Sequence, residues 1–405
     1  TADAYTKFIL KLVKDTEVTP KSDVPSVEKK VQEDDKYNQD GGYGQGYNDV
    51  ADWNIGDAVP FKLIGTIPEM DGYDTYKYIF HDTLSDGLTL NEGSVKVYVT
   101  ESKNADLSSL TSLTAREDYT LITSPAESHC SFEVSFDDLT TLEEITEQSK
   151  YIIVAYTATL NESAEIGLDG NPNEVYLEFS NNPAQSGEGD HETDETPKDE
   201  VIVFTYELDT TKVDGADTET TLKDAQFVLL NSDGTKVAKF DAENNKFDGW
   251  VDLPTGTDEA ITYEDWTTYN ETNKVILTSG VDGLFKMIGL DDGTYKLREI
   301  KAPDGYNLLP NDVEVVITAT TTNGQDWTSG TASEALTALK VKVDNGEEQD
   351  GNVSNGTVNI NVQNTKGATL PETGGMGTKI FYLAGGILAL GAGLLLVTRK
   401  RMEMR

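Results

Sequence analysis

Cysteine, histidine and positive charge are all scarce in this 405-residue sequence. One cysteine, Cys130, excludes a disulfide framework within the chain. His81 and His191 stand apart from other potential ligands, so the sequence indicates no histidine-based metal cluster. Only 32 basic residues oppose 72 acidic ones, which gives a formal net charge of −40. Such a surface repels nucleic acid, whose binding needs Lys and Arg at the phosphates, and it suits a hydrated extracellular protein.

The sequence also lacks the residue groupings of a catalytic site. His129 directly precedes Cys130, but neighbours on a strand face opposite ways, so the two are not expected to act as base and nucleophile. No acidic turn has EF-hand spacing, and the glycine-rich stretch 40–49 lacks the strand–helix context of a phosphate-binding loop. We therefore predict that the chain is not an enzyme and uses neither a cofactor nor a metal.

Short segments rich in Val, Ile, Tyr, Phe and Thr fill most of the chain, separated by Gly, Asn, Asp and Pro. This rhythm predicts an all-β fold of tandem immunoglobulin-like sandwiches. No signal peptide begins at Thr1, so we expect the chain to start inside a longer exported precursor. The predicted divisions are the tail of a truncated domain with a junction (1–21), a first sandwich (22–184), an acidic linker (185–200), a second sandwich (201–366) and a C-terminal signal (367–405).

The C-terminal signal has three parts: a pentapeptide, an apolar run at 380–397 and a basic tail at 399–405. The run is long enough to form a transmembrane helix, and the basic tail favours the cytoplasmic side. This order resembles the cell-wall sorting signal of Gram-positive bacteria. The resemblance implies that a sortase cuts between Thr and Gly, so that the membrane anchor is transient and the product joins peptidoglycan. A permanent single-span anchor is the alternative. The pentapeptide residues are Leu370, Pro371, Glu372, Thr373 and Gly374.

Both predicted sandwiches aim a lysine, a carboxyl group and an amide at apolar surroundings. Alternate residues of a strand share one face, and these side chains fall on faces that otherwise carry Val, Ile, Leu, Phe or Tyr. Buried Lys and Glu are rare unless paired. The alternative is that each lysine reaches water or forms an ordinary salt bridge. The residues are Lys29, Asp57 and Asn181 in the first sandwich, and Lys212, Glu299 and Asn364 in the second.

Burial gives such a group a specific chemistry. An apolar site lowers the pKa of a lysine and raises the pKa of a carboxyl group. The neutral amine can then attack the asparagine amide while the acid moves protons and ammonia leaves. The product is a Lys–Asn isopeptide bond, and packing holds the partners together without any cofactor.

The second sandwich resembles a collagen-adhesin B-type domain. In that family the Glu of a Gly-x-Tyr-x-Leu-x-Glu pattern is catalytic, which implies that role for Glu299. The resemblance also implies an isopeptide bond between Lys212 and Asn364. The matching stretches are 211–214, 222–230, 283–290, 293–299 and 302–306.

The first sandwich resembles the isopeptide-forming second domain of major, or backbone, pilins. This implies a bond between Lys29 and Asn181, with Asp57 as the catalytic acid. Strand parity alone ranks them above their neighbours, so the competitors Lys30, Asp52 and Asn182 stay open. The matching stretches are 24–31, 54–61 and 173–183.

Backbone pilins use a lysine in a Val-Tyr-Pro-Lys-Asn motif to receive the next subunit. Residues 18–22 read Val-Thr-Pro-Lys-Ser and depart from that motif at two positions. The resemblance implies that Lys21 accepts the Thr373 carboxyl group, and an ordinary linker lysine is the alternative.

These expectations describe the shaft subunit of a covalently polymerised pilus. Its partners would be a sortase, neighbouring pilin subunits and peptidoglycan. The alternative function is a wall-anchored adhesin or minor pilin that binds a host surface ligand.

Overall fold

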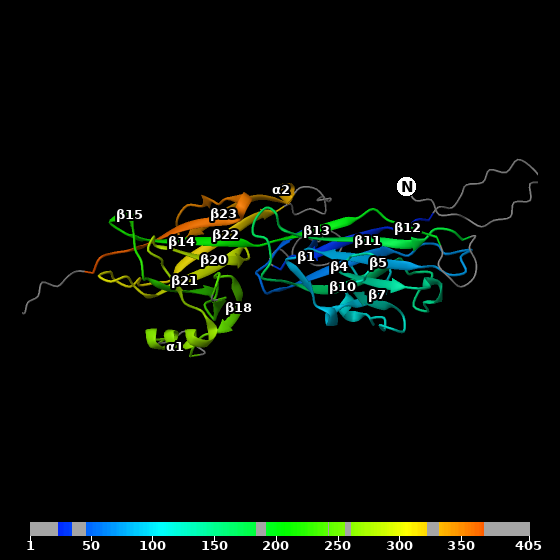
Figure 1. Cartoon of the computed structure of the whole chain (residues 1–405), viewed down its shortest axis with the longest axis horizontal. Coiled ribbons are helices and arrows are strands. Elements are labelled where there is room, and N and C mark those ends of the chain that lie inside the picture. The colour runs from blue at the N-terminus through cyan, green and yellow to red at the C-terminus, as the bar shows by residue number, and fades with distance from the viewer. Residues whose placement is uncertain are drawn as a thin grey trace, which may run out of the picture.

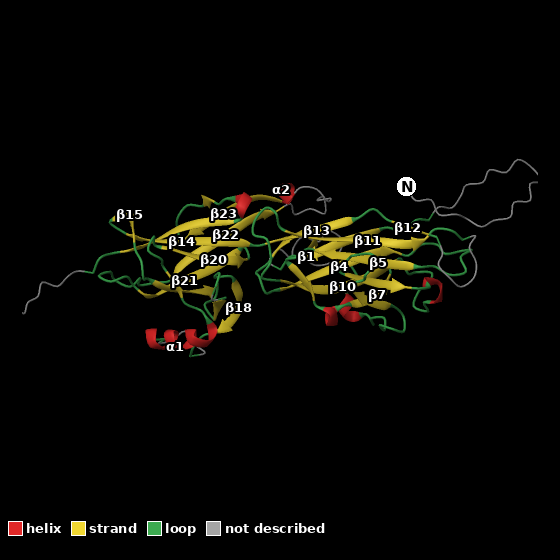
Figure 2. Cartoon of the chain, viewed as in Figure 1, coloured by secondary structure: helices red, strands yellow, loops and turns green. Residues whose placement is uncertain are grey.

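The computed structural model describes residues 23–34, 46–183, 192–241, 243–255, 261–321 and 332–367. Strands dominate these residues and form two β-sandwiches that follow one another along the long axis of the molecule (Figure 1, Figure 2). The predicted all-β class is therefore confirmed. Lys21, the pentapeptide and the apolar run 380–397 lie outside the described residues. No helix among the described residues is long and apolar enough to cross a membrane.

The described part of the first sandwich contains thirteen strands. One sheet has the order β2-β1-β4-β10-β6, with β7 also on β10, and the other has the order β3-β13-β11-β5-β9-β8, with β12 on β11. Inward-facing apolar side chains of both sheets form one core. The strands are β1 (Val27–Gln32), β2 (Tyr47–Asn48), β3 (Val50–Asp52), β4 (Ala58–Thr66), β5 (Tyr78–Leu84), β6 (Leu88–Leu90), β7 (Lys96–Thr100), β8 (Thr120–Thr123), β9 (Phe132–Phe136), β10 (Tyr151–Leu160), β11 (Asn171–Ser180), β12 (Thr193–Glu195) and β13 (Asp199–Phe204). Short 3-10 helices lie at Glu92–Ser94, Leu107–Ser109 and Leu139–Thr141.

The second sandwich contains a sheet of order β15-β14-β20, with β25 also on β14, and a larger sheet of order β18-β17-β16-β21-β22-β23-β24, with β19 on β16. Its strands are β14 (Tyr206–Asp214), β15 (Asp217–Thr221), β16 (Gln226–Asn231), β17 (Lys236–Phe240), β18 (Phe247–Asp252), β19 (Leu277–Thr278), β20 (Leu284–Leu290), β21 (Gly293–Lys301), β22 (Val313–Thr321), β23 (Leu336–Val343), β24 (Gln349–Asp350) and β25 (Thr357–Asn364). The helices are α1 (Tyr263–Asn273), α2 (Ala332–Ala335) and a 3-10 turn at Val353–Asn355.

The first and last strands of the second sandwich are neighbours. Strand β14 pairs in parallel with β25, so Lys212 lies opposite Val362, and Asp214 lies opposite Asn364. A parallel pair cannot be joined by a hairpin, and here the chain between the two strands forms nearly the whole sandwich. A link between β14 and β25 would therefore close the domain from end to end.

The stretch predicted as an acidic linker belongs partly to the first sandwich. Strands β12 and β13 pair antiparallel with β11, and β13 also pairs in parallel with β3. Val201 and Val203 enter the first core, whereas Ile202 and Phe204 enter the second. The predicted boundary at residue 200 is thus corrected to the end of β13. Continuous apolar residues occur there because each face of the strand meets a different core.

The two sandwiches are in direct contact. Ile55 N donates to Gly289 O at 2.9 Å, and Asp291 N donates to Asn54 Oδ1 at 3.0 Å. Gly289 has a φ of 85° and lies so close to Ile55 that an added Cβ would come within 2.4 Å of its side chain. Only glycine fits both the backbone conformation and this approach. The junction is therefore a packed interface.

Candidate functional site

The second sandwich brings Lys212, Glu299 and Asn364 into one buried cluster. Lys212 is 0% exposed, and its Nζ donates to the Val362 carbonyl at 2.8 Å. Asn364 Nδ2 donates to both carboxylate oxygens of Glu299 at 3.0 Å and to Asn307 O at 2.8 Å. Asn364 Oδ1 is buried and has no hydrogen-bond partner among the described residues. A buried acceptor without a donor is costly, so this oxygen is available to a proton donor.

The electrostatics of this cluster suit amide exchange. Burial lowers the pKa of Lys212 to about 8, against the opposing charge of Glu299. Burial also raises the pKa of Glu299, while hydrogen bonds from Asn364 and from the Leu309 N–H oppose the rise. Both shifts favour neutral forms. A neutral amine and a protonated carboxyl group are the states that nucleophilic attack on an amide requires.

A second buried cluster lies in the first sandwich around Lys29, which is 0% exposed. Lys29 Nζ donates to Asp82 Oδ2 and, at 2.5 Å, to Asn173 Oδ1. Tyr156 closes a ring, because its hydroxyl donates to Asp82 Oδ2 at 3.0 Å and accepts from Asn173 Nδ2 at 2.8 Å. Asp82 and Asn173 are also 0% exposed. The cluster thus contains a lysine, a carboxyl group and an amide.

Burial shifts the pKa values of this cluster in the same directions as in the second sandwich. It lowers the pKa of Lys29 to about 8, even though the Asp82 carboxylate opposes the change. It raises the pKa of Asp82, against the stabilising charge and hydrogen bond of Lys29. The amine is therefore easier to deprotonate, and the acid easier to protonate, than either would be in water.

The structure does not bring Asp57 and Asn181 to Lys29, and this corrects the predicted trio. Asp57 is half-buried in the turn before β4 and accepts from Asn54 Nδ2 at 2.9 Å. Asn181 lies beyond the end of β11, where its backbone N–H donates to Glu192 O. Strand parity gave the correct face of β11 but not the position along it, since Asn173 shares that face eight residues earlier.

The predicted competitors also lie elsewhere. Lys30 forms a buried ion pair with Asp49. Asp52 is buried at the end of β3, close to Asp291 and Asp292 of the second sandwich. Asn182 Nδ2 donates to Glu192 Oε2 at 3.0 Å. Asp82, which sequence reasoning missed, follows Tyr78 and Phe80 on the inward face of β5, and this alternation was the available signal.

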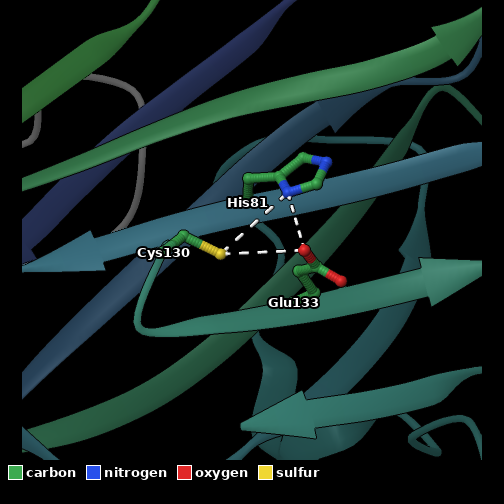
Figure 3. A group of neighbouring side chains, drawn as sticks. All are labelled: His81, Cys130 and Glu133. Carbon is green, nitrogen blue, oxygen red and sulfur yellow. Dashed lines mark hydrogen bonds and ion pairs between the residues drawn. The ribbon is translucent and has the colours of Figure 1, made fainter. Parts of the chain in front are cut away.

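Two groups among the described residues have a composition that could hold a metal ion. The first is His81, Cys130 and Glu133, whose side chains point toward one another (Figure 3). His81 Nδ1 lies 3.1 Å from Glu133 Oε1 and 4.0 Å from Cys130 Sγ, and the sulfur lies 3.9 Å from the same oxygen. Burial lowers the pKa of His81, but hydrogen bonds with Cys130 and Glu178 and the Glu133 charge outweigh it, raising the pKa to about 9.

The second group is Asp52, Asp291 and Asp292 at the contact between the sandwiches. Burial raises the pKa of Asp291 well above its usual value, and the nearby carboxylates add to the rise. Asp291 is also held by its backbone N–H, which donates to Asn54 Oδ1 at 3.0 Å. These surroundings favour the protonated form of the Asp291 carboxyl group at the junction. The other carboxylates that raise its pKa belong to Asp34 and Glu33.

Comparison with known families assigns both sandwiches and the C-terminus. Residues 55–183 match the family model of the Gram-positive pilin backbone subunit 2, Cna-B-like domain. Residues 207–331 match the prealbumin-like fold domain model. Residues 362–403 match the LPXTG cell wall anchor motif. The chain therefore contains one domain that matches the pilin backbone model, one that matches the prealbumin-like fold model, and a wall-anchor motif.

Individual proteins are similar to this chain over most of its length. The trypsin-resistant surface T6 protein of Streptococcus pyogenes serotype M6 is 25% identical over 399 residues, which is 86% of this chain and 65% of that protein. The group B streptococcus pilus 2b backbone protein is 26% identical with a TM-score of 0.50, over 79% of this chain and 97% of that chain. A 35 kDa C-terminal fragment of the major pilin GBS80 of Streptococcus agalactiae shares the fold, with a TM-score of 0.52 at 21% identity, over 84% of this chain and all of that fragment (100%).

Proposed function

We propose that this chain, which carries the domains and the anchor motif of Gram-positive backbone pilins, is the structural shaft subunit of a covalent pilus on the cell wall. The assignment rests on the two matched sandwich domains followed by an LPXTG motif. The surface chemistry agrees, because a net charge of −40 keeps a protein hydrated outside the cell. As a shaft subunit the chain is a substrate of sortase and of its own cross-linking, and turns over no other molecule.

Polymerisation would use the two ends of the chain. A sortase would cut Thr373–Gly374 and hold the new Thr373 carbonyl group until an amine attacks it. Lys21 of a neighbouring subunit would supply that amine, since it lies in a motif that resembles the acceptor of backbone pilins. The last subunit would be joined to peptidoglycan instead. Tension along the fibre would then pass between subunits through amide bonds.

In the second sandwich, Lys212 and Asn364 would form an isopeptide bond with Glu299 as the proton carrier. The Lys212 amine would attack the Asn364 side-chain carbonyl carbon. Glu299 would then take one proton from the attacking nitrogen and transfer one to the departing amide nitrogen, and ammonia would leave. One C–N bond forms and one breaks, so no oxidant or cofactor is required. The buried contact between Glu299 and Asn364 supports this assignment most directly.

In the first sandwich, we assign the bond to Lys29 and Asn173, with Asp82 as the proton carrier. The support is the direct contact of the Lys29 amine with both the Asn173 amide oxygen and the Asp82 carboxylate. Tyr156 holds the amide and the acid in place through its hydroxyl group. A proton donor on the amide oxygen would polarise the carbonyl for attack.

The intact mass of the purified chain tests the cross-links. Each isopeptide bond releases one ammonia, so the expected mass is two ammonia units below the sequence mass. Peptide mapping should then recover one branched peptide with Lys29 and Asn173 and another with Lys212 and Asn364. A full sequence mass in the folded chain would refute both bonds and leave the pilin assignment standing.

Polymerisation in the native cell wall tests the shaft assignment. Lys21→Arg keeps the charge but removes the primary amine, so we expect the high-mass ladder on denaturing gels to collapse to monomer. Lys14→Arg is a control in the same N-terminal region. An unchanged ladder in Lys21→Arg would reject Lys21 as the acceptor. If the high-mass ladder of the wild type did not contain this chain, the shaft role would be rejected.

A further inference from the structure

The outer face of the first sandwich carries a polar cluster that the pilus function does not use. His81 and Glu133 lie directly opposite each other on the paired strands β5 and β9, and Cys130 lies just before β9. Figure 3 shows the imidazole, the thiol and the carboxylate converging on one point. We propose that His81, Cys130 and Glu133 bind a thiophilic divalent metal ion of the zinc class.

The spacing of the three ligand atoms fits a tetrahedral ion. Bond lengths of about 2.0–2.3 Å at a tetrahedral zinc ion separate neighbouring ligand atoms by about 3.3–3.6 Å. The separations here are 3.1 Å for Nδ1 and Oε1, 3.9 Å for Sγ and Oε1, and 4.0 Å for Sγ and Nδ1. Shifts of about half an ångström would bring all three atoms to bonding distance.

The surroundings of His81 are those of a metal-ligating histidine. Glu178 Oε2 lies 3.2 Å from Nε2, so this nitrogen keeps its proton and Nδ1 is left for the metal. Tyr176 stacks on the ring with centroids 4.5 Å apart, and Lys77 holds Glu178 at 2.9 Å. A carboxylate behind the imidazole fixes the ring orientation and makes the free nitrogen a stronger ligand.

An ion can reach this point from solvent. A cavity of about 470 Å³ is lined by His81 and Glu133, together with Ser128, Tyr176 and Glu178. The Ser128 hydroxyl donates to Glu133 Oε1 at 2.5 Å and lies 3.2 Å from Cys130 Sγ. The cavity leaves room for a water molecule as a fourth ligand, which is the arrangement of an open zinc site.

The ligand set selects among cations. Imidazole and thiolate ligands suit zinc and related transition metals, whereas calcium and magnesium prefer oxygen ligands alone. Binding would release the Cys130 thiol proton and any second proton on His81. The resulting thiolate and the Glu133 carboxylate would balance the charge of a divalent ion, so the reaction needs no oxidant or reductant.

Metal titration of the purified full-length chain tests the site. Zinc is titrated first, and cobalt is then used as a spectroscopic substitute for zinc. We expect one equivalent of zinc to be retained against excess calcium, and cobalt to give thiolate-to-metal charge-transfer absorption. Cys130→Ser should abolish that absorption.

Glu178→Gln should weaken binding by about 10–100-fold, because it removes only the carboxylate behind His81. His129→Asn is the matched control, since this exposed neighbour of Cys130 has a φ of 57° that Asn tolerates.

A second measurement uses the unmutated chain. Zinc should slow alkylation of Cys130 at least tenfold, while excess calcium should leave the rate unchanged. Equal zinc binding by wild type and Cys130→Ser would assign the metal to the acidic surface and overturn the proposal. Cobalt binding without charge-transfer absorption, or alkylation that zinc does not slow, would overturn it as well.

Discussion

Replacing Glu299 with Gln should separate the cross-link in the second sandwich from the packing around it. Gln has nearly the same shape as Glu and can still accept from the Leu309 N–H, so the pocket should stay filled. It cannot carry a proton between Lys212 and Asn364, and the bond should not form. The intact mass should therefore lie one ammonia above the mass calculated for this variant with both cross-links.

The expected loss of stability follows from the size of the closed loop. A bond between Lys212 and Asn364 closes about 150 residues, which the chain-entropy description values at about 5 kcal/mol. Folding without a cross-link typically supplies ~5–15 kcal/mol, so the loss is a large fraction of the total. With a urea dependence of about 2–3 kcal/mol/M, the unfolding midpoint should fall by roughly 2 M.

Urea unfolding followed by circular dichroism is the assay, with mass spectrometry on the same samples. Glu314→Gln is the control, since Glu314 is an exposed glutamate on β22 of the same domain, and this variant should keep both the wild-type ammonia deficit and the wild-type midpoint. If Glu299→Gln keeps the cross-linked mass, Glu299 is not the proton carrier. If it gains ammonia with no change in midpoint, the bond does not stabilise the domain.

Further predictions concern the first sandwich and the junction. Relative to each variant's own sequence mass, Asp82→Ala should lack one ammonia fewer than the wild type, whereas Asp57→Ala should keep the wild-type deficit, and the reverse result would restore the sequence prediction. The folded-state pKa of Asp291 is raised, so its stabilising contribution is present at low pH and is lost as pH rises through that value. Thermal unfolding should therefore show Asp291→Asn to be more stable than wild type at neutral pH and no more stable in acid; equal melting temperatures at both would contradict this. Gly289→Ala should lower the melting temperature of the intact chain by several degrees, because its Cβ would overlap Ile55.

Sequence reasoning reached the fold class and the cluster in the second sandwich because both rest on local alternation. In β21 and β25, Glu299 and Asn364 share faces with apolar residues of the same strand, and the structure places them together. The role of Asn173 could not be predicted, because alternation shows which face of a strand a residue lies on but not which position along the strand meets the lysine. The match of Lys29 to Asp82 and Asn173 depends on how β1 faces β5 and β11 across the core, which only the packing of two sheets defines.

The cluster of His81, Cys130 and Glu133 could not be predicted from the sequence either, because its members meet only through strand pairing. His81 and Glu133 are adjacent because β5 pairs with β9, and three other strands separate them in the chain. A sequence scan for closely spaced ligands cannot detect such a pair. The predicted boundary places the apolar residues of β13 in the second sandwich for a related reason, since they alternate between two cores and only the packing of the sheets shows which core each face meets.

The positions of the two proposed bonds determine which part of the shaft subunit would carry force without protection. Tension entering near Lys21 would cross from β1 to β11 through Lys29 and Asn173, so the chain between them would bear no load. It would leave through Lys212 and Asn364 in the same way. Between the two bonds only residues 173–212 would then be stretched, and β13 is the strand of this segment at the junction, where it pairs with β11 and β3 and places side chains in both cores. The junction strand, rather than either sandwich, should therefore be the first element to yield under load.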